Sequence, residues 1–193
     1  MLPKFEAKQI YERLDEMPPW KVLAFACLLL ERAVPDFFRF QAETQAPGGG
    51  VLRAALSRAW CVLETGDSSY CVAISASVCD LIAPDTECYS SRYTSAALDA
   101  TVIASNLLRY IDGGPTSLIV EAASLRRDSI DMQLQFSLQL DVTREDFERL
   151  ILEHPAMQRE LQHQDADLIF LNGLGESREA TWQEIVSRSV EGD

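Results

Sequence analysis

The chain has 193 residues, of which 47% are hydrophobic, and its 17 basic and 30 acidic residues give a formal net charge of −13. This length fits a single helical domain, 1–193, that buries close to ~70% of its unfolded surface, which argues against disorder. A field this negative repels phosphate backbones, and the densest basic cluster is only Arg126-Arg127, followed by Asp128. Nucleic-acid binding is therefore not expected, and the acidic balance is typical of a solvated surface of a soluble bacterial-type protein.

Neither end of the chain carries a targeting signal. The N-terminal sequence MLPKFEAKQI lacks the apolar stretch and the cleavage site of a signal peptide, and no lipidation motif is present. We therefore expect a cytoplasmic protein. The five cysteines form no C-x-x-C pair and no zinc pattern, and an odd count without an export signal favours reduced thiols. Cys88, in a polar stretch, is the thiol that we expect to be exposed.

Proline, glycine and polar clusters divide the chain into helical lengths, and no segment shows the clear alternation of a strand. The predicted helices lie at about 4–16, 18–33, 35–44, 51–63, 69–83, 93–111, 116–140, 143–153, 155–173 and 177–189. The glycine-rich stretch 46–50 is not followed by the Gly-Lys-Ser/Thr of a phosphate-binding loop, so it is interpreted as a linker.

The helix predicted over about 18–33 contains nine consecutive apolar residues, from Val22 to Leu30. A helix that is apolar all round has no solvent face and must lie inside a protein or a membrane. Because spanning a membrane takes roughly 20 apolar residues, the run predicts the hub helix of a soluble domain and no membrane span. Pro35 is expected to end this helix, since proline disfavours the helical conformation of the residue before it.

The helix predicted over about 93–111 carries alanine, serine and threonine along its centre, from Ala96 to Ser105. Small residues let neighbouring helix axes approach closely, so this alanine-rich helix is predicted to be a second central element. The predicted fold class is all-α, a compact multi-helix array of about ten helices around the hub helix and the alanine-rich helix.

A frame of aromatic, charged and proline residues in and after the hub helix resembles a known family. The frame is Trp20-x4-Phe25-x5-Glu31-Arg32-x2-Pro35. It resembles the domain-of-unknown-function family 416, the YjaG-like bacterial proteins, and the likeness extends from about Trp20 to Leu174. Members of that family are small all-helical cytoplasmic proteins of unknown activity. The resemblance therefore implies the helical fold and supplies no reaction, cofactor or catalytic residue.

Three charged residues are candidates for a binding site: Glu31 and Arg32 at the exit of the hub helix, and Asp99 among the alanines. Charges on a buried helix need partners. Arg32 either joins an ion pair that fixes neighbouring helices or holds a carboxylate or phosphate bidentately at the floor of a pocket. Asp99 either belongs to a core ion pair, for which Arg32 is an attractive partner, or lines the same pocket.

Catalytic and metal-binding motifs are weak in this sequence. Glu160 and His163 form one Glu-x-x-His pair, whereas di-iron helical bundles use two, and the chain has only two histidines. No Gly-x-Ser-x-Gly sequence or cysteine–histidine arrangement indicates a nucleophile. We therefore expect no metal site and no cofactor, and the sequence favours a protein that is not an enzyme.

Two functions remain as hypotheses. The first is a non-enzymatic module that binds a protein partner or itself, with a homodimer as the default form of self-association. Phe37, Phe38, Phe40 and Trp182 lie near helix or chain ends, and some of them are expected to form an exposed apolar patch for this purpose.

The second hypothesis is a small-molecule-binding protein or enzyme with a polar pocket between the hub helix and the alanine-rich helix. Glu31, Arg32 and Asp99 are expected to converge on that pocket. The scarcity of groups that titrate near neutral pH favours the first hypothesis slightly over the second.

Overall fold

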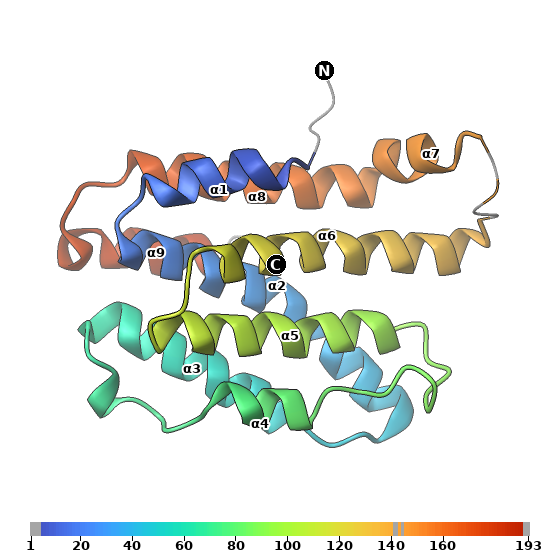
Figure 1. Ribbon diagram of the computed structural model, residues 1–193, viewed down its shortest axis with the longest axis horizontal. Coiled ribbons are helices and arrows are strands. Elements are labelled where there is room, and N and C mark those ends of the chain that lie inside the picture. The colour runs from blue at the N-terminus through green and yellow to red at the C-terminus, as the bar shows by residue number, and fades with distance from the viewer. Residues whose placement is uncertain (1–4, 141–142, 144, 191–193) are drawn as a thin grey trace.

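Nine α-helices and one 3-10 turn make up the part of the chain that the computed structural model describes, residues 5–140, 143 and 145–190 (Figure 1). The helices are α1 (Ala7–Asp15), α2 (Pro19–Thr44), α3 (Gly49–Thr65), α4 (Ala76–Leu81), α5 (Thr94–Ile111), α6 (Ser117–Leu138), α7 (Phe147–Glu153), α8 (Pro155–Gly173) and α9 (Arg178–Val190), and the 3-10 turn is η1 (Ser68–Tyr70). No strand occurs in the described ranges, which confirms the all-α class.

Helix α2 is the hub of the fold, as its apolar run predicts. Every residue from Lys21 to Leu30 is buried, and the helix contacts α3, α5, α6, α8 and α9. Figure 1 shows α2 running obliquely across the molecule, with α1 and α8 along one edge and α3 and α4 along the other. No helix among the described residues is long and apolar enough to cross a membrane.

The expected end of the hub helix at Pro35 is wrong, because α2 continues through this proline to Thr44. A proline inside a helix removes a backbone donor and costs roughly 3 kcal/mol. Phe37 and Phe40 are fully buried on the continued helix, and burying each of them contributes about 1.5–3 kcal/mol. Packing of the aromatic side chains therefore outweighs the penalty of the proline, and the separate helix predicted over 35–44 is part of α2.

Helix α5 occupies the place predicted for the alanine-rich helix. Ala97, Ala100 and Ala104 are fully buried, and the helix packs most extensively against α6 and α2. Because these side chains are small, the three helix axes approach closely around one apolar core. This packing places α6 beside the hub, and α8 contacts both.

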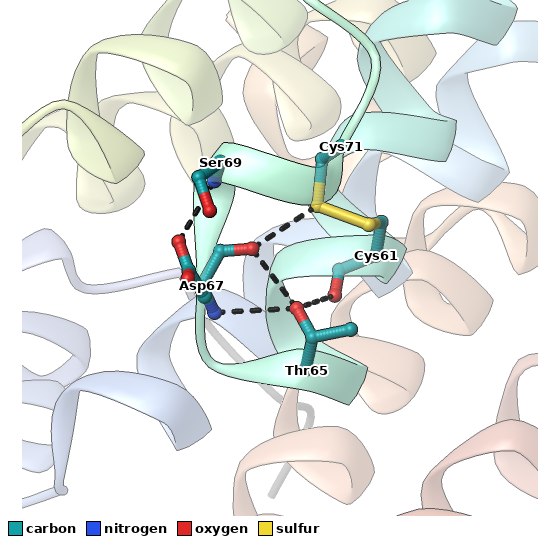
Figure 2. The surroundings of a disulfide bond; sticks show 5 residues. All are labelled: Cys61, Thr65, Asp67, Ser69 and Cys71. Carbon is teal, nitrogen blue, oxygen red and sulfur yellow. Dashed lines mark hydrogen bonds between the residues drawn. A yellow bond between two sulfur atoms is a disulfide. The ribbon is translucent and has the colours of Figure 1, made fainter.

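Two predictions for this region are wrong: the continuous helix over 69–83, and the reduced state of all thiols. A disulfide joins Cys61 of α3 to Cys71, directly after η1 (Figure 2). Between them Gly66 adopts a φ of 74°, and the Asp67 side chain accepts a hydrogen bond from the backbone N–H of Ser69 at 2.8 Å. This tight turn leads into an extended stretch, so the helical residues that remain are those of α4. Of the other cysteines, Cys88 is exposed as expected.

Several predicted element ends fall outside the described residues, which exclude 1–4, 141–142, 144 and 191–193. The undescribed residues include residue 4, where the first predicted helix starts, and residue 144, within the helix predicted over 143–153. Within the described residues, α7 begins only at Phe147. The remaining predicted helices agree with the observed ones to within a few residues.

Candidate functional site

Charged side chains from α2, α6 and α8 converge on a cavity of about 260 Å³. Its lining holds four arginines, two carboxylates and one histidine, with apolar residues between them. These residues are Arg32, Pro35, Asp36 and Arg39 of α2, Arg126 and Ile130 of α6, and Ala156, Arg159, Glu160 and His163 of α8. On each helix the first of these residues is followed by the others about one or two helical turns later. The lining residues of a given helix therefore lie on one face of that helix. Helical spacing thus builds the cavity from three separate parts of the chain.

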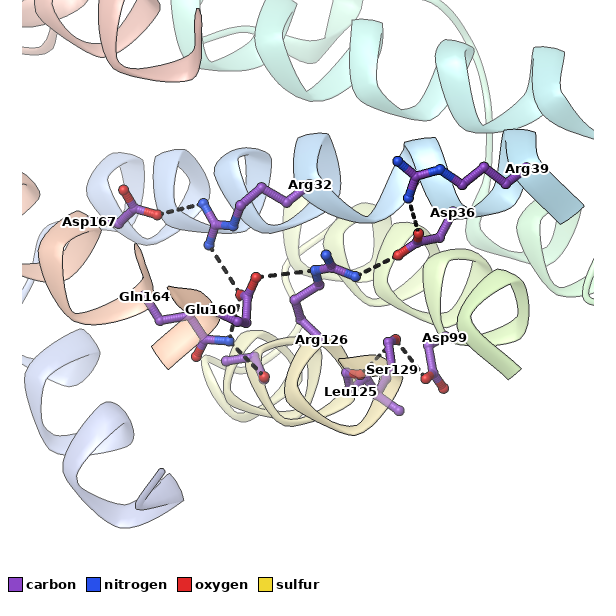
Figure 3. A network of polar contacts seen from close by, with 11 residues as sticks. Arg32, Asp36, Arg39, Asp99, Leu125, Arg126, Ser129, Glu160, Gln164 and Asp167 are labelled. Carbon is purple, nitrogen blue, oxygen red and sulfur yellow. Dashed lines mark hydrogen bonds and ion pairs between the residues drawn. The ribbon is translucent and has the colours of Figure 1, made fainter. Parts of the chain in front are cut away.

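Glu160 lies at the centre of an ion-pair network that borders the cavity (Figure 3). Only 5% of this residue is exposed. Its Oε1 lies 3.5 Å from Arg32 Nη2, and its Oε2 lies 3.3 Å from Arg126 Nε. Gln164 Nε2 also donates a hydrogen bond to Oε1, at 3.0 Å. This single carboxylate therefore connects α2 and α6 to α8.

Asp36 forms a second bridge on the other side of Arg126. Its Oδ2 accepts a hydrogen bond from Arg126 Nη1 at 2.8 Å, and its Oδ1 accepts one from Arg39 Nη1 at 2.9 Å. Asp36 and Arg126 are buried, whereas 58% of the Arg39 side chain is exposed. The network thus extends from the interior to a solvent-accessible guanidinium group.

Asp167 closes the network at its other end. This buried aspartate accepts a hydrogen bond from Arg32 Nη1 at 2.7 Å and another from Arg188 Nε at 3.0 Å. Because Arg188 lies on α9, the pairing connects the C-terminal helix to the hub through α8. Arg32 is therefore held between two carboxylates of α8, Glu160 and Asp167.

Two guanidinium groups of this network have buried N–H groups that donate no hydrogen bond among the described residues. These are Nε and Nη2 of Arg32 and Nε of Arg126. Two of the three nitrogens face Glu160 at 3.3 and 3.5 Å, beyond the usual hydrogen-bond distance. A buried donor without a partner costs about 1–3 kcal/mol. Such donors mark positions where a water or a ligand completes the bonding.

Arg159 contributes a further positive charge to the cavity. It lies in the second turn of α8, it is exposed, and it forms no ion pair with a carboxylate in the part of the chain that the structure describes. The Ala156 backbone, one turn earlier, belongs to the positive end of the α8 helix dipole. Among the described residues, Arg159 is therefore the arginine of the lining that has no carboxylate partner.

Of the three residues that the sequence singles out, Arg32 alone lines this cavity. Glu31 lies on a different face of α2, where its Oε1 accepts a hydrogen bond from Trp60 Nε1 at 2.8 Å. The Trp60 ring in turn meets Trp182 of α9 edge-to-face, with ring centroids 6.0 Å apart. Consecutive residues on an α-helix point about 100° apart, and here Glu31 points towards α3 while Arg32 points into the cavity.

Asp99 does not pair with Arg32. Its Oδ2 accepts a hydrogen bond from Ser129 Oγ at 2.8 Å, across the contact between α5 and α6. The pKa of Asp99 is raised to about 6, mainly because the carboxyl group is buried. The hydrogen bond from Ser129 lowers this pKa, the negative charge of Asp128 raises it, and the positive charge of Arg126 lowers it. Glu31, Arg32 and Asp99 therefore occupy three separate environments.

The sequence interpretation missed five charged residues of the site: Asp36, Arg39, Arg126, Arg159 and Asp167. For the residues of α2 and α8 the signal was the spacing of charges, which repeats at one and two helical turns, whereas Arg126 lies on α6 outside that pattern. Glu160 was considered only as half of a metal-binding motif, but its two oxygens face guanidinium groups. In the described residues no group of three or more histidine, cysteine, aspartate and glutamate side chains is placed to hold a metal ion.

The fold and this site define an all-helical protein with an arginine-rich cavity beside its hub helix. The chain belongs to the DUF416 family, described as proteins of unknown function, whose family model matches residues 9–191. A DUF416 family protein from Shewanella baltica OS155 has the same fold, with a TM-score of 0.81 at 19% sequence identity over 97% of this chain and 95% of that one. No curated protein matches the sequence.

Proposed function

We propose that this protein binds a small anion in the cavity between α2, α6 and α8. The observation that carries the proposal is the pair of buried guanidinium groups, Arg32 and Arg126, whose N–H groups are only partly used by carboxylates. A guanidinium group offers a planar set of donors that matches carboxylate and phosphate oxygens. Four arginines against two carboxylates line this cavity in a protein whose net charge is −13.

The carboxylates of the network support this function by orienting the arginines. Asp36 and Glu160 each contact two guanidinium groups, so the positions of those groups are fixed before a ligand arrives. Side chains held by such contacts lose little entropy on binding. The other two arginines of the lining, Arg39 and Arg159, are exposed and supply further donors.

Thermal unfolding with and without inorganic phosphate or succinate tests this proposal. A ligand at 100 times its Kd stabilises the folded state by about 2.7 kcal/mol, which raises Tm by roughly 5–10 °C for a chain of this size. The stabilisation is expected to be lost in Arg159→Ala and reduced in Arg39→Ala. Arg149→Ala, which removes an exposed arginine of α7 outside the cavity, is the matched control. Equal stabilisation in all variants would contradict the proposal.

Association with a protein partner or a second copy is a second proposal, and it rests on other residues than the sequence indicated. Phe37 and Phe40 are buried, so they cannot form the expected patch. Met132 and Phe136 lie one turn apart near the end of α6, and they are 45% and 60% exposed. Light scattering tests this alternative: an oligomer that becomes monomeric in Phe136→Ser supports it, and a monomeric wild-type protein contradicts self-association.

A further inference from the structure

Positive charges outnumber negative charges in the lining of the cavity. Four arginines and two carboxylates line the cavity. Including the next shell of ion pairs adds Asp167 and its partner on α9, Arg188, which cancel. The lining therefore carries two more positive than negative charges, around central arginines that are about 90% buried.

We infer that the ligand of this cavity is a small dianion, a compound with two negative charges on a short body, such as a phosphate monoester or a short dicarboxylate. The inference rests on the proposed function above and specifies its ligand class. A dianion neutralises the excess charge of the lining, whereas a monoanion leaves a net charge of one uncompensated. Charges that are partly removed from water interact strongly, because the surrounding protein screens them less than water does.

The size of the cavity limits the body that carries these charges. A volume of about 260 Å³ corresponds to roughly eight or nine water molecules at about 30 Å³ each. Drug-sized ligands occupy cavities of about 300–1,000 Å³, so this cavity suits a compound of fewer heavy atoms. Pro35, Ile130 and Ala156 give the lining an apolar part that fits a short carbon chain.

The carboxylates of the lining make a zwitterionic ligand a poor fit. Both oxygens of Asp36 are hydrogen-bonded to arginines, and both oxygens of Glu160 face guanidinium groups. An ammonium group would therefore compete for occupied acceptors and would add positive charge to a site that already has an excess. Arginine donors dominate the lining, which favours a ligand rich in acceptor oxygens.

Calorimetric titration with charge-matched pairs of ligands tests the inference. At about pH 8 methyl phosphate is a dianion and dimethyl phosphate a monoanion, and malonate and its monomethyl ester form a second pair. In each pair the dianion is expected to bind at least tenfold more tightly at the same ionic strength. Arg159→Ala is expected to reduce this ratio to about threefold or less, whereas Arg149→Ala, outside the cavity, is expected to leave it unchanged.

The outcomes separate the inference from the proposed function. Binding of all four probes to the wild-type protein with affinities within twofold of each other would overturn the dianion and leave anion binding intact. Absence of binding of any of the four probes would overturn both the dianion inference and the proposed function of anion binding. Tighter binding of methyl phosphate than of malonate identifies phosphate monoesters as the source of the dianion, and the reverse order identifies dicarboxylates; either order supports the inference.

Discussion

Replacing Glu160 by glutamine removes one negative charge from the centre of the network while preserving its shape. Glu160 is 5% exposed and lies 3.5 Å from Arg32 Nη2 and 3.3 Å from Arg126 Nε. Leaving a buried charge without any partner costs about 3–5 kcal/mol. Because each guanidinium group retains another carboxylate, Asp167 or Asp36, we expect a smaller loss of about 2–3 kcal/mol. For a chain of this size, Tm then falls by about 5–10 °C.

The same substitution is expected to strengthen anion binding, because Glu160 competes with the ligand for the two arginines. Removing it raises the excess positive charge of the cavity by one, and we expect methyl phosphate to bind Glu160→Gln about tenfold more tightly than the wild-type protein, or about 1.4 kcal/mol. Saturating methyl phosphate should therefore recover part of the lost Tm. Differential scanning fluorimetry and calorimetric titration measure the two effects on one sample.

A surface variant serves as the control for Glu160→Gln. Glu153→Gln on α7 removes a partner of Arg149 at 3.1 Å, and both side chains are about half exposed. Exposed pairs contribute about 0.2–1 kcal/mol, so neither stability nor affinity should change appreciably. The reasoning is refuted if Glu160→Gln is as stable as the wild-type protein, or if it binds methyl phosphate more weakly.

Three further variants test the framework around the site. Lys21 is buried, and its Nζ donates a hydrogen bond to the Leu174 carbonyl oxygen at the end of α8 at 2.7 Å; Lys21→Met should cost about 1.5–3 kcal/mol in urea unfolding. The pKa of Asp99 is raised from 3.8 to about 6. Between these two pH values the folded state binds more protons than the unfolded state, so the free energy of unfolding falls as the pH rises. Asp99→Asn should remove that fall and stabilise the protein by up to about 3 kcal/mol at about pH 8, and parallel unfolding curves at about pH 4 and pH 8 check this. Replacing both Cys61 and Cys71 by serine opens a short loop and should lower the free energy of unfolding by about 2.5–3 kcal/mol, an effect that the reduced wild-type protein should reproduce.

The two central helices could be predicted because their signals are local. An unbroken apolar run requires burial on every side, and a row of small residues requires close neighbours, whatever the rest of the chain does. The continuation of α2 through Pro35 could not be predicted in this way. It depends on the pocket that other helices provide for Phe37 and Phe40, and the stretch after Cys61 depends likewise on a pairing with Cys71 that spacing does not determine.

The candidate site could be predicted only at one point, Arg32, where a charge leaves an apolar helix. Its partner Asp167 is 135 residues away in the sequence, and the partners Asp36 and Arg126 are 90 residues apart. Charges on α2 at one-turn spacing indicate a polar helix face, but equally spaced charges cover solvent-exposed helices too. Only the packing of α6 and α8 against that face makes it the wall of a cavity.

Glu31 and Arg32 are adjacent in the middle of the hub helix, but they have different structural roles because their side chains point to different sides of α2. Glu31 accepts a hydrogen bond from Trp60, which packs on Trp182, so its side of α2 attaches α3 and α9 to the core. Arg32 faces α8 and the cavity, with a buried Nε that no described residue uses. The Trp60 donor is satisfied by Glu31, whereas Arg32 keeps unsatisfied donors next to the arginine-rich lining. The incomplete bonding of Arg32, next to a neighbour with a hydrogen-bonded partner, is therefore the reason to assign the anion to the α8 side of the hub.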